Sequence, residues 1–140
     1  PAAEPPPDLR DRRLAAVQAQ VWKQWEAASA PPPLVAVRAA EGHWEQTGVA
    51  GVSVKRLFVD AAQDRVTMLV RMTPGASYPR HRHAGPEECY VLEGDLHLPD
   101  LVLRAGDYQR AEPQSIRGLQ FTENGCLLFI VSSRHDEIVA

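Results

Sequence analysis

The sequence predicts an all-β domain, an antiparallel barrel or sandwich, preceded by one N-terminal amphipathic α-helix. From Leu34 onward, short runs rich in Val, Leu, Phe and Tyr alternate with Gly, Pro and Asp. Such runs, recurring every roughly eight to twelve residues, are typical of strands joined by turns and argue against βαβ units. The triple proline at residues 31–33 separates them from a helical pattern. We therefore expect a helix or linker over residues 1–33 and a β-barrel over residues 34–140.

The predicted helix lies between two proline-rich stretches. Asp8 stands at the N-cap position, and an apolar stripe follows at helical spacing, made of Leu14, Val17, Val21 and Trp25. The remaining faces carry Arg, Lys and Gln, and the alanine content favours a helix. Because a single helix must bury its apolar stripe, we expect it to pack on the barrel or on another subunit.

The predicted strands follow one another from the triple proline to the C-terminus. Each is rich in β-branched or aromatic residues and ends at a Gly, Pro or Asp. Gly94-Asp95 and Gly106-Asp107 are typical of turns between strands. The segments are LVAVRA (34–39), VSVKRLFVD (52–60), RVTMLVRM (65–72), ECYVLEG (88–94), DLVLRAG (100–106) and CLLFIVSS (126–133).

The composition restricts the class of protein. The chain has 140 residues, which suits one domain, and a net charge of -3 without a run of Lys or Arg, which argues against direct nucleic-acid binding. No apolar run approaches the roughly 18–20 residues of a membrane span, and the polar N-terminus lacks a secretory core. We therefore expect a cytoplasmic protein in which Cys89 and Cys126 are reduced core residues, not a disulfide.

Two histidines and a carboxylate gather in the segment HRHAGPE. His81 and His83 are two residues apart, so their side chains point to the same side of a strand. Glu87 keeps this parity, and Glu88 is the alternative carboxylate. Imidazole and carboxylate together suit zinc, iron, manganese, nickel or copper, so the segment predicts a metal site. His97 is a candidate substitute ligand, provided that its strand turns it inward.

The pattern around this segment, G-x5-H-x-H-x3-E-x6-G from Gly75 to Gly94, resembles the first motif of the cupin family. The resemblance implies a double-stranded β-helix, or jelly-roll barrel, in which the two histidines and Glu87 bind the metal. The second cupin motif is matched by AGDYQRAEPQSIRGLQF, where Arg117 occupies the position of a fourth, histidine ligand. Arginine stays protonated and does not ligate metals.

The substitution at Arg117 leaves three outcomes open. In the first, three protein ligands and water hold the metal in an open site. In the second, the guanidinium forms a fork with Glu87 or with a bound carboxylate, which makes Arg117 the candidate cofactor-binding residue. In the third, Arg117 neutralises Glu87 and the site holds no metal.

The resemblance extends to the ChrR-type cupins over about residues 34–137. It rests on EGHWEQTGVAGVSVKRLFVD, TMLVRMTPGASYPRHRHAGPEECYVLEGDL, AGDYQRAE and GCLLFIVSSRHDE. It implies a regulatory or sensing module for oxidative stress signals, as in the C-terminal half of zinc-binding anti-sigma factors. The implied metal is divalent, zinc for a regulatory domain and iron, manganese or nickel otherwise. The implied partners are a sigma factor, bound through an N-terminal zinc domain that is missing here, a small-molecule ligand, and a second copy in a homodimer.

Two alternatives to a regulatory module stay open. The first is a small metal-dependent dioxygenase-like enzyme acting on a carbonyl or carboxylate substrate, because some ChrR-like cupins resemble such enzymes. In it, His81, His83 and Glu87 hold the metal and Arg117 anchors an anionic group of the substrate. The second is a structural cupin whose helix mediates dimerisation and whose barrel binds nothing.

Overall fold

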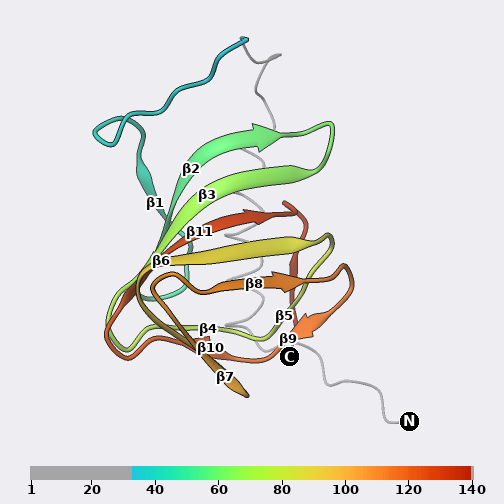
Figure 1. Ribbon diagram of the computed structural model, residues 1–140. Helices are drawn as coiled ribbons and strands as arrows, with labels where there is room; N and C mark the ends of the chain where they lie inside the picture. Colours follow the sequence, from blue (N-terminus) through green and yellow to red (C-terminus); the bar gives the residue numbers. More distant parts are fainter. Residues whose placement is uncertain (1–32, 140) are drawn as a thin grey trace.

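β-Strands form the regular secondary structure of residues 33–139, the part of the chain that the computed structural model describes. Figure 1 shows them curving into two layers around a common interior. The strands are β1 (Trp44–Gln46), β2 (Val52–Asp60), β3 (Arg65–Met72), β4 (Ser77–Tyr78), β5 (His81–Arg82), β6 (Glu87–Leu98), β7 (Leu101–Arg104), β8 (Tyr108–Ala111), β9 (Ile116–Arg117), β10 (Gln120–Phe121), β11 (Cys126–Ser132) and β12 (Glu137–Ile138).

The long strand β6 belongs to both layers. Its first half pairs with β11 and β8, and its second half pairs with β7 and β10, always antiparallel. One layer therefore runs β1-β2-β3-β11-β6-β8, whereas β7, the end of β6, β10 and β4 form the other. A separate small sheet has the order β12-β5-β9. This arrangement is a jelly-roll barrel, and it confirms the predicted all-β cupin fold.

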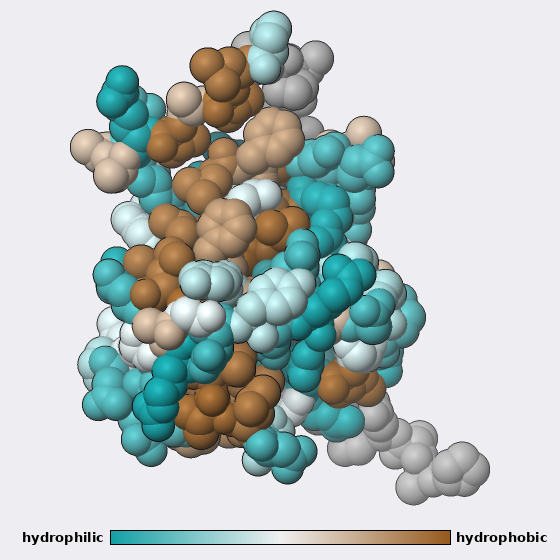
Figure 2. Space-filling model, viewed as in Figure 1, coloured by the Kyte–Doolittle hydropathy of each residue, from teal (hydrophilic) through white to brown (hydrophobic). Residues whose placement is uncertain are grey.

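Alternating side chains of the larger layer form the core. In β3 and β11 every second residue is buried, and all of these except Ser132 belong to the main hydrophobic cluster together with Val52 and Val54 of β2. Burying one such side chain is worth about 1.5–3 kcal/mol, so the two strands anchor the barrel. The outward positions include exposed apolar residues such as Phe129, and Figure 2 shows hydrophobic side chains gathered on the face turned to the viewer.

The predicted strands agree with the structure except in one segment. β2 and β3 have the predicted bounds, and β6, β7 and β11 overlap the predicted runs. The segment LVAVRA forms no strand, and its Leu34 is 80% exposed. It is held instead by the buried ammonium of Lys55, which donates to the carbonyls of Arg38 and Ala39 at 3.4 and 3.0 Å. The predicted N-terminal helix lies outside the described residues.

Gly94 forms a bend inside β6, not the predicted turn between two strands. Its φ is +81°, and a Cβ at this position would lie 1.9 Å from the carbonyl oxygen of Gly125. Only glycine combines this dihedral angle with so close an approach of two backbones. The bend lets β6 leave one layer and enter the other. Gly106 and Asp107, in contrast, do lie between β7 and β8 as predicted.

Replacing Gly94 with alanine should destabilise the barrel more than the same change at Gly75. Both glycines have nearly the same positive φ, +81° and +82°, but the space around Gly75 is open within 4 Å. The positive φ alone costs alanine roughly 1–2 kcal/mol. In Gly94→Ala the free energy of unfolding should fall by about 1–3 kcal/mol more, because the backbone of Gly125 must move. Urea unfolding of both variants measures the difference, and equal losses would show that the close approach is unimportant.

A buried carboxylate secures the turn that follows the bend. Asp95 is 2% exposed and accepts the backbone N–H groups of Glu123 and Asn124 at 2.9 and 3.0 Å. Its Oδ2 also lies 2.8 Å from Nε2 of His97. Burial alone would raise the pKa of Asp95, but these hydrogen bonds outweigh it and hold the pKa below the usual value of 3.8. Asp95 therefore ties the β10–β11 turn to β6.

This pKa predicts how stability changes in acid. Because the folded-state pKa of Asp95 is depressed, its contribution is complete above pH 3.8 and is lost as the pH falls through the folded-state pKa. Asp95→Asn should unfold about 1–3 kcal/mol more easily at pH 7 and differ less from the wild type near pH 2. Asp107→Asn is the matched control, since this exposed carboxylate accepts one backbone N–H, from Arg104 at 2.8 Å. A deficit in Asp95→Asn that does not shrink in acid would contradict the assignment.

Candidate metal centre

The two histidines of the HRH segment lie at the small sheet beside the barrel interior. His81 is in β5, where its Cα pairs with Arg117 of β9 and Ile138 of β12. The backbone of His83 is fixed on both sides, because its N–H donates to Ser115 at 2.9 Å and its carbonyl accepts from Gln114 at 2.7 Å. Backbone pairing therefore sets where both imidazoles enter the barrel.

Three side chains converge at this point. His81, His83 and Glu87 each offer one ligand atom, and these atoms all lie within 4.8 Å of one another. Both histidines are buried, at 6% and 1% exposure, and their ring centroids are 4.7 Å apart. The structure thus brings together the three residues that sequence parity selects. Two nitrogens and one carboxylate oxygen are a donor set for a divalent transition metal.

Hydrogen bonds orient both rings. Nδ1 of His81 lies 3.0 Å from the carbonyl oxygen of Pro79, so a proton on Nδ1 leaves Nε2 as the ligand atom. Nδ1 of His83 lies 3.2 Å from Oδ2 of Asp136 and 3.2 Å from Oε2 of Glu87. Nε2 of His83 is buried and has no hydrogen-bond partner. An unpartnered buried nitrogen costs about 1–3 kcal/mol, which a bound cation would offset. The residues therefore fit a metal ion.

The pKa values of the two histidines are shifted in opposite directions. Burial lowers the pKa of His81, only partly offset by the Pro79 carbonyl and by Glu87, so this ring is neutral and ready to ligate near neutral pH. Burial would also lower the pKa of His83, but hydrogen bonds to Asp136 and Glu87 outweigh it and raise the pKa to about 9. Binding of a metal ion at Nε2 would take the place of one of the two ring protons of this imidazolium.

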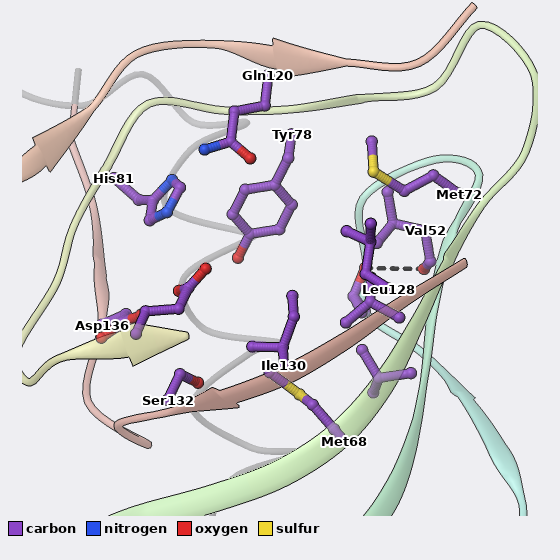
Figure 3. A pocket seen from close by; sticks show the side chains of 14 residues that line it. Val52, Met68, Met72, Tyr78, His81, Gln120, Leu128, Ile130, Ser132 and Asp136 are labelled. Carbon is purple, nitrogen blue, oxygen red and sulfur yellow. Dashed lines mark hydrogen bonds between the residues drawn. The ribbon is translucent and has the colours of Figure 1, made fainter. Parts of the chain in front are cut away.

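A cavity of about 100 Å³ is lined by two of the three side chains, His81 and Glu87. Figure 3 shows its apolar wall, with Met68, Leu128 and Ile130, facing a polar end with His81 and Asp136. The apolar wall belongs to the larger layer of the barrel. The lining residues are Thr47, Val52, Val54, Met68, Val70, Met72, Tyr78, His81, Glu87, Gln120, Leu128, Ile130, Ser132 and Asp136.

The alternative carboxylate, Glu88, does not join the histidines. Glu87, the first residue of β6, lines the cavity, whereas Oε1 of Glu88 accepts the hydroxyl of Tyr108 at 2.9 Å in an exposed contact. Successive residues of a strand point to opposite faces, so only one of the pair turns inward. Glu87, the carboxylate preferred from the sequence, is therefore the one that faces the cavity, and its role as a metal ligand stays a prediction.

His97 lies apart from the three gathered side chains, whereas Arg117 is the cross-strand neighbour of His81 but does not line the cavity. Nη2 of Arg117 donates to the carbonyl of Arg110 at 3.5 Å, and Arg117 is not among the residues that line the cavity. Its role as a cofactor-binding residue stays a prediction. His97 stacks on Phe121 with ring centroids 4.5 Å apart and contacts Asp95, outside the group of candidate ligands.

Asp136, Tyr78 and Gln120 were not singled out by the sequence. Asp136 follows β11 and contacts His83, a residue 53 positions earlier in the chain. No local pattern reveals such a pairing, although the polar run RHDE after the last long strand marks where it occurs. Tyr78 packs edge-on against His81 with centroids 5.1 Å apart. No local pattern of the sequence distinguishes Tyr78 from the other tyrosines.

Both cysteines are free and buried, as predicted. Burial raises the pKa of Cys89 to about 12 and that of Cys126 to about 11. Because the thiolate is the reactive form, neither residue is suited to react with oxidants.

Glu87→Gln should weaken metal binding, whereas Glu88→Gln should leave it unchanged. Removing the charged ligand takes one of three protein donors from the site, so the Zn²⁺ affinity should fall by about 10-fold or more. Competition with a chromophoric chelator measures both dissociation constants. Equal losses in the two variants would show that Glu87 is not a ligand.

Comparison with known proteins identifies the family. The model of the ChrR cupin-like domain matches residues 33–135. Among solved structures, the fold is similar to an acetylacetone dioxygenase from Acinetobacter johnsonii (TM-score 0.63, 15% identity, 76% of this chain and 76% of that one). It is also similar to the polyketide cyclase RemF from Streptomyces resistomycificus (0.61, 21%, 76% and 86%).

A third similar structure is that of Rhodobacter sphaeroides SigE in complex with the anti-sigma ChrR (TM-score 0.59, 22% identity, 92% of this chain and 70% of that one). At these identities the structures show the fold alone. No curated protein matches the chain. Among the residues that the structure describes, no helix is long and apolar enough to cross a membrane. On the family match and the barrel that it covers, the chain belongs to the ChrR cupin-like domain family.

Proposed function

We propose that this chain is a metal-binding regulatory module of the ChrR anti-sigma type, which senses oxidative stress signals and relays them to transcription. The observation that carries the proposal is the buried group of His81, His83 and Glu87, with ligand atoms within 4.8 Å of one another. The membership in the ChrR cupin-like family supports the regulatory role.

Zinc is the proposed metal. It accepts nitrogen and oxygen donors in a tetrahedral site and needs no further protein ligand where water takes the fourth position. Three protein donors are available here, and Arg117, at the position of a fourth ligand in related cupins, directs its guanidinium to the carbonyl of Arg110. The proposed site is therefore open on the side of the cavity, where a small molecule can reach the metal.

The metal, not a thiol, is the proposed sensing element. Both cysteines are buried and their pKa values are raised, so they are protonated at neutral pH. A signal that enters the cavity meets the metal ligands His81 and Glu87 directly, since both line it. Zinc has no redox chemistry, so the signal would act by binding at the open position of the metal and not by oxidising it.

A sigma factor is the proposed partner, in line with the solved complex of SigE with the anti-sigma ChrR. The contact would be made through a separate zinc-binding half. Sequencing the parent gene upstream of the codon for Pro1 tests this arrangement. A coding region with His and Cys zinc ligands is expected; an initiator codon directly before Pro1 would contradict the fused form. The predicted homodimer is tested by light scattering, where the mass of one chain would reject it.

Protein purified without chelators should contain about one equivalent of zinc per chain. His81→Ala and His83→Ala should each remove most of it, because two remaining donors hold the ion poorly. His97→Ala is the matched control, since His97 contacts Asp95 and Phe121 away from the site. Elemental analysis of the four proteins measures the metal content. Absence of any transition metal from the wild type, even after incubation with Zn²⁺, would contradict the proposal.

A metal-dependent dioxygenase-like enzyme is the second candidate function. The observation that favours it is the cavity of about 100 Å³ with an apolar wall next to the candidate ligands. Two of the similar folds are an acetylacetone dioxygenase and a polyketide cyclase, both named for oxygenated carbon compounds. Two histidines and one carboxylate also match the set that holds iron in non-haem oxygenases. In this form iron would supply the site for oxygen, and Arg117 would have to turn from the carbonyl of Arg110 to anchor an anionic substrate group.

Oxygen consumption separates the two candidates. A regulatory module loaded with Fe²⁺ should consume oxygen no faster than its His83→Ala variant when offered β-diketones and related carbonyl compounds. An enzyme should consume oxygen at least 10²-fold faster than that variant, roughly, because removal of a ligand abolishes the metal site. Measurements with an oxygen electrode decide between them, and substrate-dependent uptake in the wild type alone would overturn the regulatory proposal.

A further inference from the structure

A carboxylate from the C-terminal segment reaches back to the candidate metal ligands. Asp136 lies between β11 and β12, and its Oδ2 is 3.2 Å from Nδ1 of His83. Its other oxygen, Oδ1, accepts the backbone N–H of Ala84 at 3.0 Å. The Asp136 side chain is only 12% exposed and lines the cavity, and Figure 3 shows it on the same side as His81.

Each of the two histidines has an acceptor at Nδ1, but the acceptors differ in kind. His81 meets the carbonyl oxygen of Pro79, a backbone acceptor that the fold fixes. His83 has no backbone acceptor at Nδ1 and meets side chains instead, Asp136 and Glu87, both at 3.2 Å. A carboxylate that binds the ion directs its oxygen lone pairs to the metal. Once Glu87 ligates the metal, Asp136 is the acceptor that remains for His83.

The second ring nitrogen of His83, Nε2, is the one available to a metal ion. Nε2 of His83 is buried without a hydrogen-bond partner, which is the state expected of a nitrogen that ligates a metal. A ring that donates Nδ1–H to a carboxylate carries its lone pair on Nε2. Such carboxylate–histidine–metal arrangements fix the ring and raise the basicity of the ligand.

We propose that Asp136 is the positioning residue of the metal centre: it accepts Nδ1–H of His83 and holds Nε2 toward the ion. The inference rests on the proposed metal binding and extends it to the C-terminal segment. The family match ends at residue 135, so Asp136 lies just beyond it. Through Oδ1 the same side chain also fixes Ala84, the first residue of the turn that leads to Glu87.

Zinc affinity of Asp136 variants tests the proposal. Asp136→Ala should bind Zn²⁺ about 10–100-fold more weakly than the wild type, the range for loss of such a partner. Asp136→Asn should fall between the two, because its single amide oxygen can accept only one of the two N–H groups, those of His83 and Ala84, that the carboxylate accepts. Glu137→Ala is the matched control: this neighbouring carboxylate is 69% exposed and pairs with Arg82 at 3.7 Å. Its affinity should equal that of the wild type.

Two further measurements identify a positioning role. The visible absorption of the Co²⁺-substituted protein depends on the atoms bound to the metal, so it should be the same in the wild type and in Asp136→Asn. The zinc-loaded wild type should show a slowly exchanging Nδ1–H of His83 in NMR spectra, and Asp136→Ala should lose it. The Nδ1–H of His81 serves as an internal reference, because its acceptor is Pro79.

The outcomes are distinguishable. Wild-type affinity in Asp136→Ala, with a metal-loaded wild type, would overturn the positioning role and leave the metal site intact. An altered Co²⁺ spectrum in Asp136→Asn would make Asp136 a direct ligand and would also overturn it. A wild type that binds no Zn²⁺ would reject the proposed function itself and this inference with it. If Asp136→Ala does not fold, the isosteric Asp136→Asn supplies the comparison of affinity.

Discussion

The proposed metal centre depends on the convergence of two imidazoles and one carboxylate inside a barrel whose opposite wall is apolar. Side chains of this kind are rarely buried without partners, because desolvation is costly. In this domain His81 and His83 are both nearly inaccessible, and one nitrogen of His83 has no protein partner. A cation at the meeting point of the three ligand atoms would satisfy that nitrogen and balance the charge of Glu87. The same ion would explain why polar side chains gather at one end of an otherwise apolar cavity.

The barrel produces this convergence through pairings that are distant in sequence. The small sheet places His81 opposite Arg117 and Ile138, and the backbone of His83 is pinned by the segment before β9. β6 starts at Glu87 in one layer and passes to the other at the Gly94 bend. The metal ligands therefore come from one short segment, while the scaffold that aims them comes from most of the described chain. Loss of either part would separate the ligands.

Short-range patterns in the sequence predict much of this structure. Alternation of apolar residues gives β2 and β3 with their bounds, and strand parity selects Glu87 over Glu88. The predictions that fail concern features that depend on residues distant in the sequence. LVAVRA has the composition of a strand but pairs with none, and Gly94 has the signature of a turn but bends a continuous strand around Gly125. Asp136 lies 53 residues from its histidine, and the direction of the Arg117 side chain depends on packing that no local pattern encodes.

A crystal structure of the zinc-incubated protein, with anomalous scattering recorded at the zinc absorption edge, tests the metal centre most directly. We expect one strong anomalous peak per chain, about 2.0–2.2 Å from a nitrogen of each histidine and from an oxygen of Glu87. Asp136 should then lie outside the coordination sphere, against Nδ1 of His83. A barrel with no peak at this position, or with zinc bound at the molecular surface alone, would contradict the account.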